Sequence, residues 1–167
     1  MNLQMPIERV VVDASPLIIL FKGQLEQLLP KLFNEIIVPA AVWEEVTDSK
    51  EDIAARALPT TSWVKRLELS EISGEIFAWG LGAGESEVLS YAFNHHQYWA
   101  IVDDKAARRC AKTLRIRTLG TGGLLVLAKR RGVIPSIIPA LKAIECAGLW
   151  LSQDVIKLLM QQAGEDD

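Results

Sequence analysis

Short runs of β-branched apolar residues alternate along this chain with longer segments whose apolar residues recur at helical spacing. This alternation is the pattern expected of a parallel sheet covered by helices, and it predicts an α/β fold. The expected strands are Arg9–Val12, Glu35–Val38, Val64–Leu67, Trp99–Val102 and Arg117–Leu119.

Helices are predicted between and after these strands. Ser15 and Pro16 are typical of an N-cap followed by proline at the first helical position, and they predict a helix through Phe21 that Gly23 ends. The segment Glu68–Gly82 is predicted to be an irregular connection. The other predicted helices are Leu25–Leu32, Pro39–Thr47, Lys50–Leu58, Ala83–His95, Lys105–Leu114, Thr121–Arg131, Ser136–Cys146 and Ser152–Gln162.

The length of the chain, 167 residues of which 50% are hydrophobic, fits one domain with a substantial core. We expect a single domain over residues 1–163, followed by a short acidic tail, residues 164–167, that is disordered. The apolar stretch near the N-terminus has no basic start and is interrupted by Asp13 and Pro16, and no segment reaches the roughly 18 apolar residues of a spanning helix. We therefore expect a soluble, cytoplasmic protein with no membrane partner.

Acidic residues follow two of the predicted strands. A run of valines leads into Asp13, and a second apolar run leads into Asp103 and Asp104. Ligands of open parallel sheets bind beyond the carboxyl ends of the strands, so these carboxylates converge if the two strands are neighbours. Two further acids, Glu45 and Glu85, lie at helix positions that can face the same place.

A cluster of four or five carboxylates without His or Cys partners is typical of a site for a hard cation. Mg2+ and Mn2+ prefer oxygen ligands, and such ions can activate water and stabilise charge on a phosphoryl group during transfer. Phosphodiester hydrolysis is the chemistry that matches this set of residues.

Each of these acids also has a structural role that would explain its presence. Asp13 could accept hydrogen bonds from the turn that follows it, and Asp104 could cap the next helix. Glu85 would interact favourably with the dipole of the helix that it opens. Glu45 could be a solvated residue, with Glu44 as the alternative acid facing inward.

The net charge of -3 argues against a protein that coats nucleic acid non-specifically, but the charge is unevenly distributed. No Asp or Glu lies between Lys105 and Ile144. This stretch suits a phosphate-backbone partner, with ordinary solvated helix surfaces as the alternative. The basic residues of the stretch are Lys105, Arg108, Arg109, Lys112, Arg115, Arg117, Lys129, Arg130, Arg131 and Lys142.

Thr121 follows the last predicted strand and Gly120. It is expected to cap the next helix, and its hydroxyl could also hold a water or a phosphate.

Five segments together carry a family resemblance. They are VVDASPLIILFKGQLEQLL, IIVPAAVWEEV, GAGESEVLSYA, AIVDDKAARRCAKTLRIRTLGTGGLLVLAKRRGVIPS and LKAIECAGLWLS. In this order and spacing they resemble the PIN domains, and within them the branch of bacterial and archaeal proteins related to VapC-type toxins. The resemblance covers nearly the whole chain.

The resemblance implies a three-layer α/β/α fold with a central parallel sheet, and a Mg2+- or Mn2+-dependent endoribonuclease. By position, Asp13, Glu85 and either Asp103 or Asp104 would hold one or two ions, and Glu45 would orient or deprotonate the attacking water. The sequence departs from the family pattern at two places. It has Glu85 where many PIN domains carry Asp, and valine where many carry Thr or Ser before the final acid.

The same resemblance implies a nucleic-acid contact by the stretch Lys105–Arg117, with Lys105, Arg108, Arg109, Lys112 and Thr121 as the residues expected to hold RNA. It further implies a homodimer and an antitoxin protein as partner, and thus the toxin component of a toxin–antitoxin pair.

Two other functions deserve comparison. A dinucleotide-binding enzyme is suggested by Gly82 and Gly84 at the start of a helix with Asp103 downstream, but Glu87 occupies the third glycine position and Glu85 would repel a pyrophosphate. A catalytically silent PIN-like module that binds protein is the second alternative. Metal-dependent cleavage of RNA distinguishes the enzyme from this module.

Overall fold

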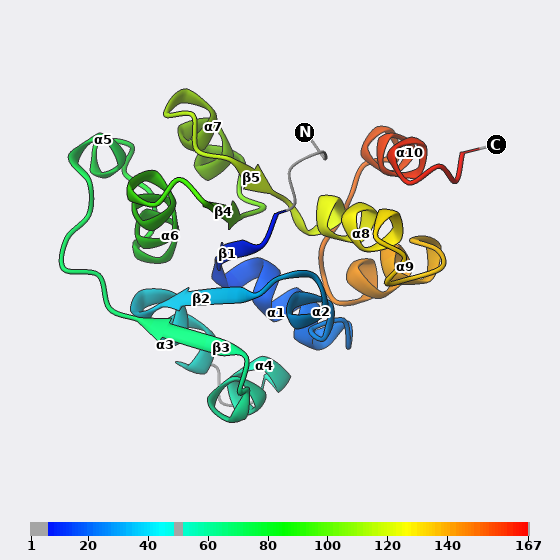
Figure 1. Cartoon of the computed structure of the whole chain (residues 1–167), viewed down its shortest axis with the longest axis horizontal. Helices are drawn as coiled ribbons and strands as arrows, with labels where there is room; N and C mark the ends of the chain where they lie inside the picture. Colours follow the sequence, from blue (N-terminus) through cyan, green and yellow to red (C-terminus); the bar gives the residue numbers. More distant parts are fainter. Residues whose placement is uncertain (1–6, 49–51, 167) are drawn as a thin grey trace.

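Five parallel strands form one sheet in a computed structural model that describes residues 7–48 and 52–166 (Figure 1). The strands are β1 (Arg9–Val12), β2 (Glu35–Pro39), β3 (Val64–Leu67), β4 (Tyr98–Ile101) and β5 (Thr118–Leu119). Each boundary lies within one residue of the predicted one. The α/β class predicted from the alternation of apolar runs and helical segments is therefore confirmed.

The strand order, β3-β2-β1-β4-β5, puts β1 in the centre of the sheet. From β1 the chain moves outward to β2 and β3, then returns to the other side of β1 for β4 and β5. The direction of winding thus reverses between β1 and β4. At such a switch point the connections leave the strands in opposite directions, and a crevice opens beyond the carboxyl ends of the strands.

The two strands at the switch point are buried because helices cover the sheet. All three valines of β1 are 0% exposed, and so are Ala100 and Ile101 of β4. Parallel strands buried on both faces need continuous apolar runs, which is why these strands consist mainly of apolar residues. The polar residues that follow them mark the point where the sheet ends.

Helices form layers around the sheet, as expected for a three-layer α/β/α arrangement (Figure 1). Helix α1 contacts α3, α4 and α9, whereas α6 contacts α3, α5 and α7. Figure 1 shows α8, α9 and α10 gathered together, away from α5 and α6. The helices are α1 (Ala14–Lys22), α2 (Leu28–Leu32), α3 (Ala40–Asp48), α4 (Ile53–Ala57), the 3-10 helix η1 (Leu58–Thr60), α5 (Gly74–Phe77), α6 (Ala83–Asn94), α7 (Lys105–Thr113), α8 (Thr121–Arg130), α9 (Ile138–Cys146) and α10 (Gln153–Gln162).

Two predicted N-caps were wrong. Helix α1 begins at Ala14 with Asp13, and not Ser15, as its N-cap, because the Asp13 carboxylate accepts the first helical N–H. Helix α8 begins at Thr121 with Gly120 as its N-cap, so Thr121 is the first helical residue. In both cases a single N-cap residue separates the end of a strand from the start of the helix.

Several predicted boundaries also differ from the structure, since α2 begins at Leu28 and not at Leu25, and α9 at Ile138 and not at Ser136. The segment predicted to be irregular contains α5, a short helix fixed by Ile76, which is 0% exposed. The predicted helix Lys50–Leu58 corresponds to α4 and the start of η1. Its first two residues, 50 and 51, lie outside the described residues.

The end of the chain is fixed as far as Glu165. Its carboxylate accepts hydrogen bonds from the hydroxyl of Ser136 and, at 2.8 Å, from the N–H of Ile137, and it lies 3.5 Å from the ammonium of Lys129. The disorder expected of residues 164–167 stays a prediction, and Asp167 lies outside the described residues. Within the ranges that the structure describes, none of the helices has the length and apolar character needed to cross a membrane.

Candidate active site

Asp13 lies at the centre of the crevice, directly after β1. Its backbone N–H donates to the carbonyl of Ile101 at 3.0 Å, which extends the pairing of β1 with β4 by one residue. Its Oδ1 accepts the N–H of Ala14 at 2.9 Å, and the residue is only 5% exposed. Strand pairing and helix capping together fix this carboxylate between the two central strands.

The adjacent acids after β4 have different surroundings. Asp104 is exposed, and its Oδ2 caps α7 by accepting the N–H of Ala107 at 2.9 Å. Asp103 points to the start of α8, where its two oxygens accept the N–H and the hydroxyl of Thr121 at 2.8 and 2.6 Å. This geometry favours Asp103 over Asp104 as the acid that shares the crevice with Asp13.

Glu45, on α3, approaches Asp13 across the first turn of α6. The two helices meet at Gly84, where a β-carbon would lie 3.3 Å from the side chain of Val42 on α3. A β-carbon at this glycine would lie 3.4 Å from Oδ1 of Asp13 and 3.7 Å from Oε1 of Glu45. The structure therefore places Glu45 beside Asp13.

Glu85 lies in the first turn of α6 and folds back toward the start of its own helix. Its Oε2 stands so close to Gly82 that a β-carbon there would collide with it. The backbone of Gly82 has an ordinary φ of -61°, so this position does not need the conformational freedom of glycine, and the flexible end of Glu85 can move away from a larger residue here.

Glu87 is a site residue that the sequence did not indicate. Its Oε1 accepts the N–H of Ala41 in the first turn of α3 at 3.2 Å, so it fastens α6 to α3. This hydrogen bond holds the helix of Glu45 against the helix of Glu85. Only the three-dimensional contact reveals the role, since an acid on a helix surface has no distinctive spacing.

The pKa of Asp13 is raised from 3.8 to about 7, and burial is the largest cause. The hydrogen bond from Ala14 opposes this rise, and the nearby charges of Glu85, Glu45 and Asp103 contribute to it. The pKa of Glu45 is also raised, first by partial burial of its carboxyl and then by Glu85. Four carboxylates from β1, α3, α6 and the end of β4 thus share one electrostatic environment.

The donor set fits a hard divalent cation, since it offers only carboxylate oxygens. Among residues 7–48 and 52–166, no three carboxylate, imidazole or thiol groups stand close enough together to hold one ion as they are placed. Mutual repulsion keeps uncompensated carboxylates apart. A bound cation would offset this repulsion, and Asp13, Asp103 and Glu85 are the residues that would hold it.

The basic residues predicted to bind nucleic acid lie on α7, beside this cluster. Lys105, Arg108, Arg109 and Lys112 are all exposed. Thr121, in contrast, is 0% exposed and donates both of its polar hydrogens to Asp103. Its placement agrees with a role in positioning Asp103 and not with the expected contact to nucleic acid.

Comparison with known proteins gives one family. The family model DUF3368, described as a PIN domain, matches residues 9–165. No curated protein and no solved structure matches the chain significantly. The matched region includes all four clustered carboxylates.

The buried charge of Asp13 yields a prediction about stability. Because the pKa is about 7 in the folded protein and 3.8 in the unfolded chain, the folded state binds this proton more tightly. The contribution of this proton to the free energy of unfolding is fully present below about pH 4 and is lost as the pH rises through about 7. In Asp13→Asn the amide oxygen still accepts the Ala14 N–H, but no charge is buried. We expect this variant to be more stable than the wild type in EDTA at about pH 8, by about 2 kcal/mol, measured by urea unfolding.

Asp104→Asn serves as the matched control, because Asn also caps helices and Asp104 is exposed. It should unfold as the wild type does at both acidic and alkaline pH. A variant at Asp13 that is no more stable than the wild type at alkaline pH would show that burial of this charge carries no penalty.

Proposed function

The chain belongs to the PIN domain family, and on this basis we propose that its carboxylate cluster is the active site of a Mg2+- or Mn2+-dependent endoribonuclease. The observation that carries the proposal is the convergence of four carboxylates at the switch point of the sheet. The pKa of Asp13 is raised mainly by burial and also by the charges of the other three. Such a concentration of negative charge is costly for folding and is expected where a cation binds.

Asp13, Glu85 and Asp103 are the residues that would hold the metal. A divalent cation bound there lowers the pKa of a water molecule and balances the negative charge of a phosphodiester. Asp13 is fixed by the strand pairing, and Asp103 by its two hydrogen bonds from Thr121. Because hydrogen bonds hold these two residues, Glu85 is the ligand that would move.

Glu45 is suited to orient the attacking water and to take its proton at Oε1. Its pKa is raised, which makes the carboxylate a better base than an ordinary surface glutamate. The hydrogen bond between Glu87 and Ala41 holds its helix in place. Loss of that contact would misplace the base without removing it.

We extend the proposal to the toxin component of a toxin–antitoxin pair, acting as a homodimer. The support is the resemblance to VapC-type toxins, together with large apolar side chains at the surface: Phe77 is 75% exposed and Trp150 is 82% exposed. Induced expression in a bacterial host tests this role. Growth arrest by the wild type but not by Asp13→Asn is expected, and equal growth of both strains would contradict it.

Cleavage of labelled RNA tests the nuclease directly. Purified protein should cut single-stranded RNA in Mn2+ or Mg2+ and not in EDTA. Asp103→Asn should lower the rate by about a hundredfold or more, because it removes a ligand charge while an amide can still contact Thr121.

Asp104→Asn is the matched neighbour and should cleave at nearly the wild-type rate, since its role is to cap α7. An equal loss of cleavage rate in the Asp103→Asn and Asp104→Asn variants would contradict the assignment of Asp103 as the metal ligand. A folded, metal-binding protein that cleaves neither RNA nor single-stranded DNA would favour the silent protein-binding module instead.

A further inference from the structure

The first turn of α8 holds Asp103, but its own sequence gives it little rigidity. Thr121 donates two hydrogen bonds to Asp103, and the next two residues are Gly122 and Gly123. Glycine is a poor helix former because its backbone loses much conformational freedom on folding. The N-cap residue, Gly120, has no side chain that could bond to this turn. The position of Thr121 therefore depends on what packs against the turn from outside.

Leu159 of α10 packs against this turn. A β-carbon at Gly122 would lie 2.7 Å from Cδ1 and 3.3 Å from Cδ2 of Leu159, so both methyl groups lie close to the glycine backbone. Leu159 is 7% exposed and is the one buried residue of α10, a helix that the structure describes over its whole length. The buried side chain of α10 thus contacts the residue next to Thr121.

Leu119 of β5 contacts the same turn. A β-carbon at Gly123 would lie 2.9 Å from Cδ1 of Leu119. One leucine from the sheet and one from α10 therefore pack against two consecutive glycines. Because the glycines have no side chains of their own, truncation of Leu159 would leave a cavity that the turn itself cannot fill.

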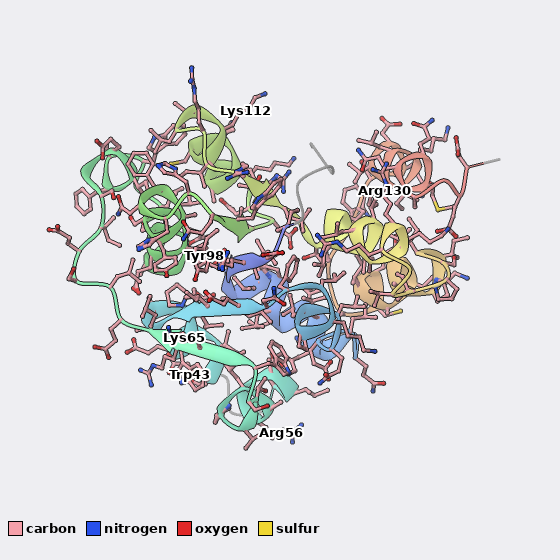
Figure 2. The ribbon with its side chains drawn as sticks, in the orientation of Figure 1. Trp43, Arg56, Lys65, Tyr98, Lys112 and Arg130 are labelled. Atoms are coloured by element: carbon pink, nitrogen blue, oxygen red, sulfur yellow. The ribbon has the colours of Figure 1, made fainter. Side chains whose placement is uncertain are left out.

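Polar bonds at the end of α8 fix the position of α10. Figure 2 shows Arg130 between the two helices, where its Nε donates to the carbonyl of Gln162 at 2.7 Å. The ammonium of Lys129 donates to the carbonyl of Ala163 at 3.4 Å and lies 3.5 Å from the carboxylate of Glu165. Since these bonds tie the last turn of α10 to the end of α8, Leu159 has a defined place on the start of α8.

We propose that α10 positions the metal ligand Asp103, because Leu159 fixes Gly122 and thereby the two hydrogen bonds from Thr121. This inference rests on the proposed function and extends it to a helix that follows the carboxylates in sequence by about fifty residues. Leu159 is a positioning residue, since it brings no polar group to the ion. Asp13 is held by the pairing of β1 with β4, so the loss of Leu159 displaces one ligand and leaves the other in place.

The affinity for Mn2+ tests the proposal without any RNA. Free Mn2+ would be measured by electron paramagnetic resonance during titration of the protein. Leu159→Ala should weaken binding about tenfold or more, as loss of a residue that orients a metal ligand does. The matched control, Leu158→Ala, removes the same atoms from the adjacent residue, which is 51% exposed, and should bind within about twofold of the wild type. Leu159→Met keeps the volume and should recover most of the affinity.

A second control separates positioning from a general loss of stability. Leu159→Ala also lowers the free energy of unfolding, because it empties part of the core. Leu28→Ala removes the same atoms from α2, which packs on β2, at a residue that is 5% exposed. It should lower the urea midpoint in the same way and leave the affinity for Mn2+ unchanged. An equal loss of affinity in Leu28→Ala and Leu159→Ala would overturn the proposal.

A double-mutant cycle tests the route through Thr121. Thr121→Val removes the hydroxyl that donates to Asp103 and keeps the backbone N–H. Leu159→Ala should weaken Mn2+ binding much less in this background than in the wild type, because both changes act on the same ligand. Additive losses of affinity would overturn the proposal, since they would mean that Leu159 acts independently of Thr121.

The outcomes distinguish this inference from the proposed function. Affinity for Mn2+ that requires Asp103 but not Leu159 would overturn the inference alone. Affinity that depends on Leu159 in a protein that cleaves no RNA would keep the positioning role and reject the nuclease, and a wild type that binds no Mn2+ would overturn both. In the active protein, cleavage by Leu159→Ala should recover as Mn2+ is raised, because the ligand is displaced and not lost.

Discussion

The pairing of β1 with β4 is the interaction on which the arrangement of the site depends. Hydrogen bonds between these strands continue past their formal ends, to the N–H of Asp13 and the carbonyl of Ile101. They bring two distant parts of the sequence to the same edge of the sheet, where the winding direction reverses. The apolar runs that drive this pairing are therefore as important for the site as the acids that follow them.

The second constraint is the cost of uncompensated charge. Asp13 is held by strand pairing and by its capping bond, so it cannot turn to solvent, and its pKa is raised accordingly. Asp103 is fixed as firmly by Thr121. The fold thus maintains a local concentration of negative charge that weakens the apo protein, a trade-off common at functional sites. The exposed cationic residues of α7 lie directly beside the cluster and offset part of its negative charge.

The strands and the edge of the sheet where the acids gather could be predicted from the sequence, because strands buried on both faces have a continuous apolar pattern. The choice between Asp103 and Asp104 could not be predicted from the sequence. Neighbouring residues after a strand point in different directions, and only the contact with the start of α8 decides which of the two turns inward. The predicted cap at Ser15 was wrong because Asp13, two residues earlier in the sequence, is an equally good N-cap. The role of Glu87 depends on a contact between two helices that no local pattern encodes.

The position of the metal tests the central claim most directly. Crystals grown with Mn2+ and measured by anomalous diffraction would locate the ion without reference to activity. The account predicts a peak bound by Asp13 and Asp103, with Glu85 turned toward it. A peak on Asp104 or at a remote surface position, or no peak at a concentration that supports cleavage, would contradict it.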